Sequence, residues 1–105
     1  MAKMDRYNDD KAKLSYLLVG KESNDGQAKV WEFGAKKYAR GNWLKGANYT
    51  EVMDSLLRHI NAFASGEDID PESCLPHVDH MQCNAKMLSQ FFHTKPECDD
   101  RVEPE

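Results

Sequence analysis

Residues 51–80, EVMDSLLRHINAFASGEDIDPESCLPHVDH, contain the clearest structural signals of the chain. This stretch starts as an amphipathic helical pattern, crosses a polar hinge at 66–73 and enters a second helical pattern after Pro76. The stretch holds three of the four histidines of the chain, together with a dense run of Asp and Glu. A small core does not need so many ionisable groups, so this density indicates a site for a metal ion or a phosphate.

Composition limits the chain to one small domain, because 105 residues are too few for a second core. The net charge is −4 and no basic stripe is present, so duplex nucleic acid is not an expected partner. No apolar run reaches the roughly 20 residues of a membrane span, and the N-terminus lacks the apolar core of a signal peptide. The three cysteines form no Cys-x-x-Cys motif. We therefore expect free thiols, no membrane contact and a cytoplasmic location.

Sequence signals divide the chain into a flexible arm at 1–9, a helical domain at 10–94 and an acidic, disordered tail at 95–105. At the start of the domain, an apolar run that ends at Gly20 fits either a short helix or an extended segment. The turn-forming sequence SNDG at 23–26 then precedes a helical pattern over roughly 25–39. This pattern is the second expected element.

Two more expected helices flank the hinge. The first begins at Asn48 or Thr50, and with Asn48 as the cap, Glu51 is in position for a capping box; Gly66 ends this helix. The second is capped by Ser73 and continues to the end of the domain. Three or four helices without an alternating strand pattern predict an all-α fold, a small helical bundle. Their narrow apolar faces make a homo-oligomer the expected state.

His77 and His80 lie three residues apart, so both project from one helix face, and that face is the apolar one. Such an inward pair is either part of a hydrogen-bonded network or bound to a metal or substrate. Glu51 and Asp54 share one side of the preceding helix, and this carboxylate pair suits a magnesium ion that also binds phosphate oxygens. The alternative for Asp54 is a solvated ion pair with Arg58, one turn further along.

The hinge carboxylates Asp68 and Asp70 lie in an acidic run that lacks the spacing and the glycine of an EF-hand loop, so a solvated acidic turn is the default interpretation. A zinc site is suggested by the regular spacing of Cys74, His77, His80 and Cys83. On an α-helix, side chains three residues apart differ in direction by about 60°. All four residues can therefore face one ion only if Cys74 lies in the turn before the helix.

The segment KKYARGNW at 36–43 combines three cations, a glycine and two aromatic rings. Lys36, Lys37 and Arg40 can bind a triphosphate, and Tyr38 or Trp43 can stack on a base. The alternative is a helix end whose cations offset the helix dipole, with Trp43 in the core. Both interpretations place this segment at the end of the second element.

Three ordered motifs resemble the phage dATP/dGTP diphosphohydrolase N-terminal domain family: GAKKY and GNW within 34–43, LLRH at 56–59, and GEDIDPES followed by LPH and His80 within 66–80. The resemblance extends over residues 9–92. It implies a phage-encoded nucleotide-handling protein in the host cytoplasm, akin to the all-α MazG-like nucleotide pyrophosphohydrolases. Those enzymes hold magnesium with a Glu-x-x-Glu followed by a Glu-x-x-Asp. Only the second half is present here, as Glu51 and Asp54, because Glu32 is followed three residues later by Ala35.

The resemblance implies a metal-dependent pyrophosphohydrolase that cleaves (deoxy)nucleoside triphosphates, of dATP or dGTP type, to monophosphate and pyrophosphate. The cofactor, Mg²⁺ or Mn²⁺, is expected on Glu51, Asp54, His77 and His80, with the histidines replacing the missing carboxylates. The catalytic candidates are Asp54, Asp68 and Asp70, and one of the last two would orient the water. The expected substrate-binding residues are Lys36, Lys37, Tyr38, Arg40, Asn42, Trp43, Arg58 and His59. Two alternatives are a non-catalytic viral protein that sequesters a nucleotide and an inhibitor of a host protein.

Overall fold

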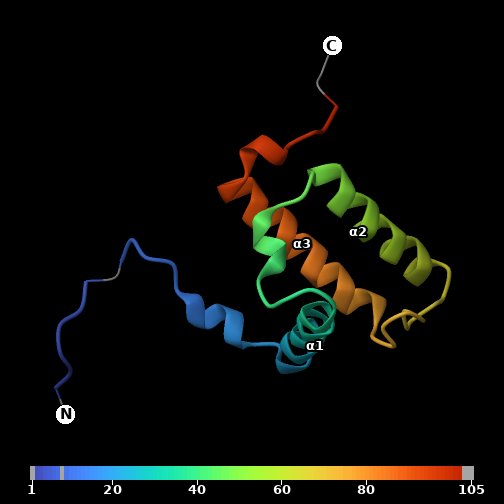
Figure 1. Cartoon of the computed structure of the whole chain (residues 1–105). Coiled ribbons are helices and arrows are strands. Elements are labelled where there is room, and N and C mark those ends of the chain that lie inside the picture. Colours follow the sequence, from blue (N-terminus) through green and yellow to red (C-terminus); the bar gives the residue numbers. More distant parts are fainter. Residues whose placement is uncertain (1, 8, 103–105) are drawn as a thin grey trace.

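The computed structural model describes residues 2–7 and 9–102, and the regular elements in this range are all helical (Figure 1). The α-helices are α1 (Lys21–Lys37), α2 (Tyr49–Ala64) and α3 (His77–Thr94), and the short 3₁₀ turns are η1 (Leu14–Leu18), η2 (Asn42–Lys45) and η3 (Pro96–Cys98). Within the described ranges the β-type pairing is one isolated bridge between Ile69 and Pro76. The predicted all-α class is confirmed. Residues 1 and 8 of the expected arm and 103–105 of the expected tail lie outside the described residues.

Helix α3 is the centre of the bundle, because both α2 and α1 pack against it. Figure 1 shows α2 and α3 side by side, joined by a loop at one end, while the N-terminal segment extends away from the three helices. The core cluster consists of Tyr49, Val52 and Phe91, and the Tyr49 hydroxyl donates a 3.0 Å hydrogen bond to the Phe91 carbonyl. Trp43 packs against this cluster and thereby anchors η2 to the two helices.

The N-terminal region differs from the expectation at two points. The apolar run before Gly20 forms only the turn η1, whose side chains are exposed, and α1 begins at Lys21, several residues before the predicted start. Gly20 has a φ of +82°, so it sets the direction in which the chain enters α1. The SNDG sequence is helical because α3 supplies partners for it: Gln82 accepts a 3.0 Å hydrogen bond from the Ser23 hydroxyl and donates another of 3.0 Å to the Ser23 carbonyl.

One side of α3 is covered by α1. Gly26 lies so close to Asp79 that an added Cβ would overlap with the carboxylate, and Asp79 also accepts a 3.0 Å hydrogen bond from Gln82. Cys83 is buried on this side, where its thiol donates to the Gln27 carbonyl at 3.6 Å, and burial raises its pKa to about 12. A neutral thiol bonded to a carbonyl does not serve as the zinc ligand that the cysteine spacing suggested.

Helix α2 buries only the first part of its apolar face. Tyr49 and Val52 are buried, whereas Ile60 and Phe63, further along the helix, are 37% and 45% exposed. The contact with α3 instead continues through Ser55, which accepts a 3.4 Å hydrogen bond from the buried Asn84 side chain. Polar side chains thus occupy the middle of the α2–α3 interface, and part of the apolar surface of α2 is left open to solvent.

The first turn of α2 is capped from the C-terminal segment. Glu51 is at the third helical position as predicted, but Asn48 makes no side-chain bond to the backbone. Asp100 instead accepts hydrogen bonds from both the backbone N–H (3.0 Å) and the hydroxyl of Thr50. Residues 95–102, where we expected disorder, therefore carry η3 and a capping contact in the described structure. No helix in the described part of the chain is long and apolar enough to cross a membrane.

Candidate functional site: a histidine–aspartate cluster beside an aromatic groove

The α2–α3 loop is held in one conformation by backbone hydrogen bonds. Gly66, at a φ of +99°, donates to the Phe63 carbonyl at 3.0 Å, and Glu67 donates to the Ala62 carbonyl at 3.0 Å. This is the double bond pattern of a Schellman motif, so Gly66 ends α2 as predicted and reverses the chain. Further along, the backbone N–H of Asp70 donates to the Leu75 carbonyl at 2.9 Å. These bonds fix the Asp70 side chain next to the last turns of α2.

Helix α3 begins later than predicted, at His77 with Pro76 as its N-cap, because Ser73 is used for another purpose. Ser73 donates both its backbone N–H (3.0 Å) and its hydroxyl (2.8 Å) to Oδ2 of Asp70. The backbone N–H of His77 donates to the Asp68 carbonyl at 2.9 Å. The loop and the first turn of α3 are thereby locked together.

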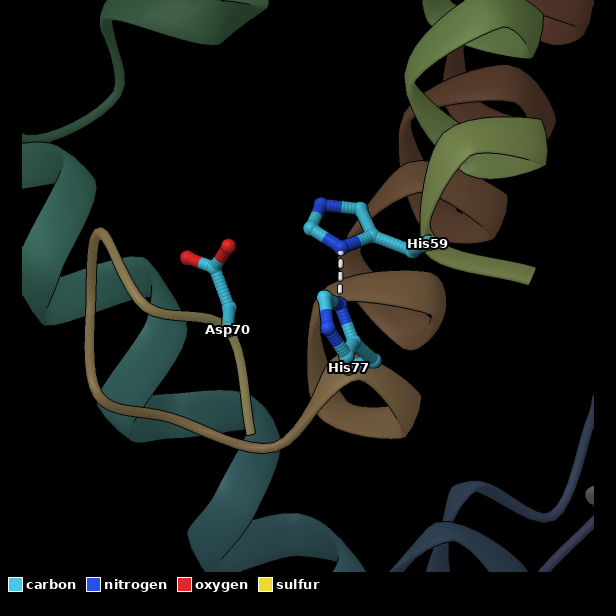
Figure 2. Close-up of side chains that lie close together, drawn as sticks. All are labelled: His59, Asp70 and His77. Atoms are coloured by element: carbon cyan, nitrogen blue, oxygen red, sulfur yellow. Dashed lines mark hydrogen bonds between the residues drawn. The ribbon is translucent and has the colours of Figure 1, made fainter. Parts of the chain in front are cut away.

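Three side chains from these elements meet at one point: His59 from α2, Asp70 from the loop and His77 from α3 (Figure 2). One ligand atom of each lies within 4.8 Å of the others, and Nδ1 of His59 is 2.8 Å from Nδ1 of His77. Among the described residues, no other set of three or more His, Cys, Asp or Glu side chains meets this condition. We call these residues, with the adjoining His80, the histidine–aspartate cluster.

His80 adjoins the other three residues and supports them. Its ring stacks on His59 at 4.5 Å between centroids and 8° between planes, and its Nε2 is 2.7 Å from the Ser73 hydroxyl oxygen. The same nitrogen is 3.6 Å from Oδ2 of Asp70. Both predicted histidines, His77 and His80, therefore do face inward, and the serine connects His80 to the aspartate.

The electrostatics of the cluster favour neutral His59 and His80 rings beside a charged Asp70 carboxylate. Burial, and then the neighbouring histidines, lower the pKa of His59; burial also lowers that of His80. Burial opposes ionisation of Asp70, but the two hydrogen bonds from Ser73 outweigh it and hold the Asp70 pKa below its ordinary value. At neutral pH these two rings are uncharged and Asp70 is ionised, and neutral imidazoles and carboxylates are donors for a cation.

His77 is the most buried member of the cluster and is incompletely satisfied. Its side chain is 4% exposed, and its Nε2 has no hydrogen-bond partner among the described residues. Oε1 of Glu67 lies 3.3 Å from this nitrogen, which is ion-pair range, although the alignment falls short of a hydrogen bond. A buried ring nitrogen that faces a carboxylate is costly if it presents a lone pair, so the proton of a neutral His77 ring is favoured on Nε2.

A groove of about 1060 Å³ opens beside the cluster, and His80 is in its lining. Cationic and polar side chains from the end of α1 and from η2 line it as well: Lys37, Tyr38, Arg40, Asn42 and Trp43. Trp31 stacks on Trp43 at 4.7 Å between centroids, so one face of that indole is covered. We call this hollow the aromatic groove; it brings most of the predicted substrate-binding residues next to one member of the cluster.

The other predicted site residues lie apart from this arrangement. Glu51 and Asp54 are exposed on α2, and neither belongs to the one described group of side chains close enough to share an ion. Arg58 is exposed on the same helix, and Lys36 is exposed and absent from the described lining of the groove. Asp68 is exposed and contributes its carbonyl rather than its carboxylate to the loop.

Sequence reasoning placed His59 with the substrate-binding residues and did not see it as a potential metal ligand. The available signal was its position seven residues after Val52, two helical turns further along the buried face. Ser73 and Glu67 were also missed, because their roles depend on how the loop folds back.

The described residues thus form a small all-α bundle with a histidine–aspartate cluster beside a cationic, aromatic groove. The family described as "dATP/dGTP diphosphohydrolase, N-terminal" matches residues 2–101, and the chain belongs to that family. A protein of Salmonella phage PMBT28 named dATP/dGTP diphosphohydrolase is 28% identical to it over 92 residues, which are 88% of this chain and 31% of the relative. The chain thus spans about a third of the length of that relative. No solved structure gives a significant match.

Proposed function

We propose that this chain binds a purine deoxynucleoside triphosphate and cleaves it between the α- and β-phosphates, releasing pyrophosphate. The phage relative named dATP/dGTP diphosphohydrolase supports the substrate class. The observation that carries the proposal is the aromatic groove, because it runs from the cations at the end of α1 to His80 of the histidine–aspartate cluster. Its volume of about 1060 Å³ is large enough for a nucleotide.

In this proposal, different groove residues contact different parts of the nucleotide. Lys37 and Arg40 neutralise the phosphates, and Asn42 offers an amide for hydrogen bonding. Tyr38 stacks on the base, since its ring is 68% exposed, while Trp43 already has one face against Trp31 and supplies the wall of the groove. Lys37 is 3.5 Å from Glu72, an exposed pair that a phosphate can replace at little cost.

The cluster supplies the chemistry at the other end of the groove. Asp70 is ionised and held in place by Ser73, so it can help to orient the attacking water. A divalent cation would act there as a Lewis acid toward the phosphate oxygens. Two imidazoles and one carboxylate fit Mn²⁺ better than Mg²⁺, which prefers oxygen ligands throughout.

The alternative is a protein that binds the nucleotide without turnover. One observation favours it: Glu51 and Asp54, the two carboxylates expected to complete a magnesium site, are exposed and do not join the cluster. With fewer acidic ligands, the same groove would sequester a nucleotide and release no product.

The test is to incubate the purified chain with each deoxynucleoside triphosphate and with Mn²⁺ or Mg²⁺, and to separate the products by chromatography. We expect monophosphate and pyrophosphate from dATP or dGTP. The Lys37→Ala/Arg40→Ala variant should bind nucleotide about 10-fold or more weakly, since a hydrogen bond to a charged group contributes about 1.5–3 kcal/mol. Lys29→Ala, an exposed α1 cation outside the described groove lining, is the matched control.

The outcomes separate the two functions. If a nucleotide raises the melting temperature but is not cleaved, the function is sequestration and not hydrolysis. If Lys37→Ala/Arg40→Ala binds the nucleotide as tightly as Lys29→Ala does, the nucleotide does not bind in the groove. That outcome would contradict both the hydrolase and the sequestration proposals.

A further inference from the structure

The nitrogen donors of the cluster are already placed as metal ligands. Nδ1 of His59 and Nδ1 of His77 point at each other across 2.8 Å. Two nitrogens bound to one ion at the usual distances lie about 2.9–3.4 Å apart. Without an ion, one of the two must carry a proton and donate it to the other, since two lone pairs at this distance repel. A small outward rotation of either ring makes room for a cation in place of that proton.

The third donor comes from Asp70. Its Oδ2 accepts both hydrogen bonds from Ser73, whereas no described residue donates a hydrogen bond to its Oδ1. Figure 2 shows the carboxylate and the two rings turned toward one space between α2, the loop and α3. The Asp70 side chain is 17% exposed, so the space is screened but open to an entering ion.

Glu67 contacts the ring of His77 on the side opposite the proposed ion. It lies 3.3 Å from Nε2 of His77, on the side of the ring away from the Nδ1 that faces His59. A carboxylate there favours the tautomer with the proton on Nε2, which leaves the Nδ1 lone pair for an ion. This arrangement also accounts for the incompletely satisfied, buried Nε2 of His77.

From this geometry we propose that His59, Asp70 and His77 form a binding site for a divalent first-row transition-metal ion, of the Mn²⁺ to Zn²⁺ series. Two imidazoles and one carboxylate leave coordination positions for water or substrate, as in catalytic rather than structural sites. His80 is not a ligand, because its Nε2 is engaged with Ser73; it positions the His59 ring by stacking. On binding, His59 gives up the Nδ1 proton it shares with His77 and carries its proton on Nε2.

The test is titration of the metal-free full chain with Co²⁺, Zn²⁺, Mn²⁺ and Mg²⁺, followed by calorimetry, melting temperature and the visible absorption of Co²⁺. We expect one ion per chain, a raised melting temperature with Co²⁺ or Zn²⁺, and no response to Mg²⁺ at the same concentration. Asp70→Asn and His59→Asn should weaken Co²⁺ binding at least 10-fold. His93→Gln, which changes an exposed histidine of α3, should bind as the unaltered chain does.

Asp70→Asn retains an acceptor for Ser73, and circular dichroism of each variant verifies that the bundle is folded. The proposal is overturned if folded Asp70→Asn and His59→Asn bind Co²⁺ with unchanged affinity, or if Cys74→Ser alone abolishes binding, since the ion would then sit on the exposed thiol. Absence of any metal response overturns it too. The metal titration contains no nucleotide, so its result does not depend on the outcome of the hydrolysis assay.

Discussion

Two glycines of α1 differ in what surrounds them, and this difference predicts opposite tolerance to a methyl group. Gly34 has nothing within 4 Å of an added Cβ, whereas at Gly26 the Cβ would meet the carboxylate of Asp79. Alanine is favoured over glycine in a helix interior by about 0.5–1 kcal/mol. We expect Gly34→Ala to raise the free energy of unfolding by roughly that amount. Gly26→Ala should give no such increase, because the new methyl group would displace the Asp79 carboxylate and break its hydrogen bond with Gln82.

Urea unfolding of the two variants beside the unaltered chain measures this difference. Equal stabilisation by both substitutions would show that α1 does not approach α3 as closely as described. The double variant Gly26→Ala/Asp79→Ala should recover part of the helix-propensity gain, since the overlapping carboxylate is removed.

The candidate site was only partly predictable from the sequence. The inward orientation of His77 and His80 follows from helical periodicity and is confirmed. The partnership of His59 with His77 depends on the crossing of α2 over α3, which periodicity does not give. Likewise, the contact of Asp70 with Ser73 is set by the loop conformation rather than by any helical face.

Among the elements, α2 depends on a residue that is remote in sequence. Asp100 accepts from the first-turn N–H and the hydroxyl of Thr50, and these bonds hold the Asp100 pKa below its ordinary value of 3.8. We expect Asp100→Asn to lower the melting temperature by a few degrees at neutral pH, because a charged acceptor at a helix N-terminus is lost. Asp10→Asn, an exposed change outside the bundle, is the control.

The pH dependence of this contact has a definite sign. The folded chain holds Asp100 ionised to lower pH than the unfolded chain does, so between the two pKa values the unfolded state binds more protons. The stabilisation is present above about pH 4 and disappears as the pH falls through the folded pKa. Thermal unfolding from pH 7 to pH 2 should therefore show a smaller acid-induced loss in Asp100→Asn. The same acid sensitivity in both proteins would exclude the capping contact.

The elements themselves were largely predictable, and their partners were not. The end of α2 at Gly66 and the presence of a helix after Pro76 follow from local turn chemistry. The helical state of SNDG in α1 and the capping of α2 by Asp100 require contacts with distant residues such as Gln82, which local signals do not encode. Tertiary contacts therefore shifted the helix starts more than the helix ends.

For the whole molecule, the open apolar surface of α2 and α3 predicts self-association. Leu57 and Phe92 are 51% and 65% exposed, and with Met53 and Leu88 they line a hollow of about 410 Å³. Exposed patches of this kind mark contact surfaces. We expect the mass from analytical ultracentrifugation to rise with concentration, and Leu57→Lys/Phe92→Lys to reduce that rise. A chain that stays monomeric throughout the range would contradict the expectation.

The loop that carries Asp70 also has a consequence for how the chain folds. His59, Asp70 and His77 belong to one helix–loop–helix unit, and the backbone bonds that shape the loop join residues close in sequence. Contacts of low sequence separation form early, because little loop-closure entropy opposes them. Helix α1 contributes none of these three side chains, so the cluster can assemble before α1 docks on α3 and completes the groove.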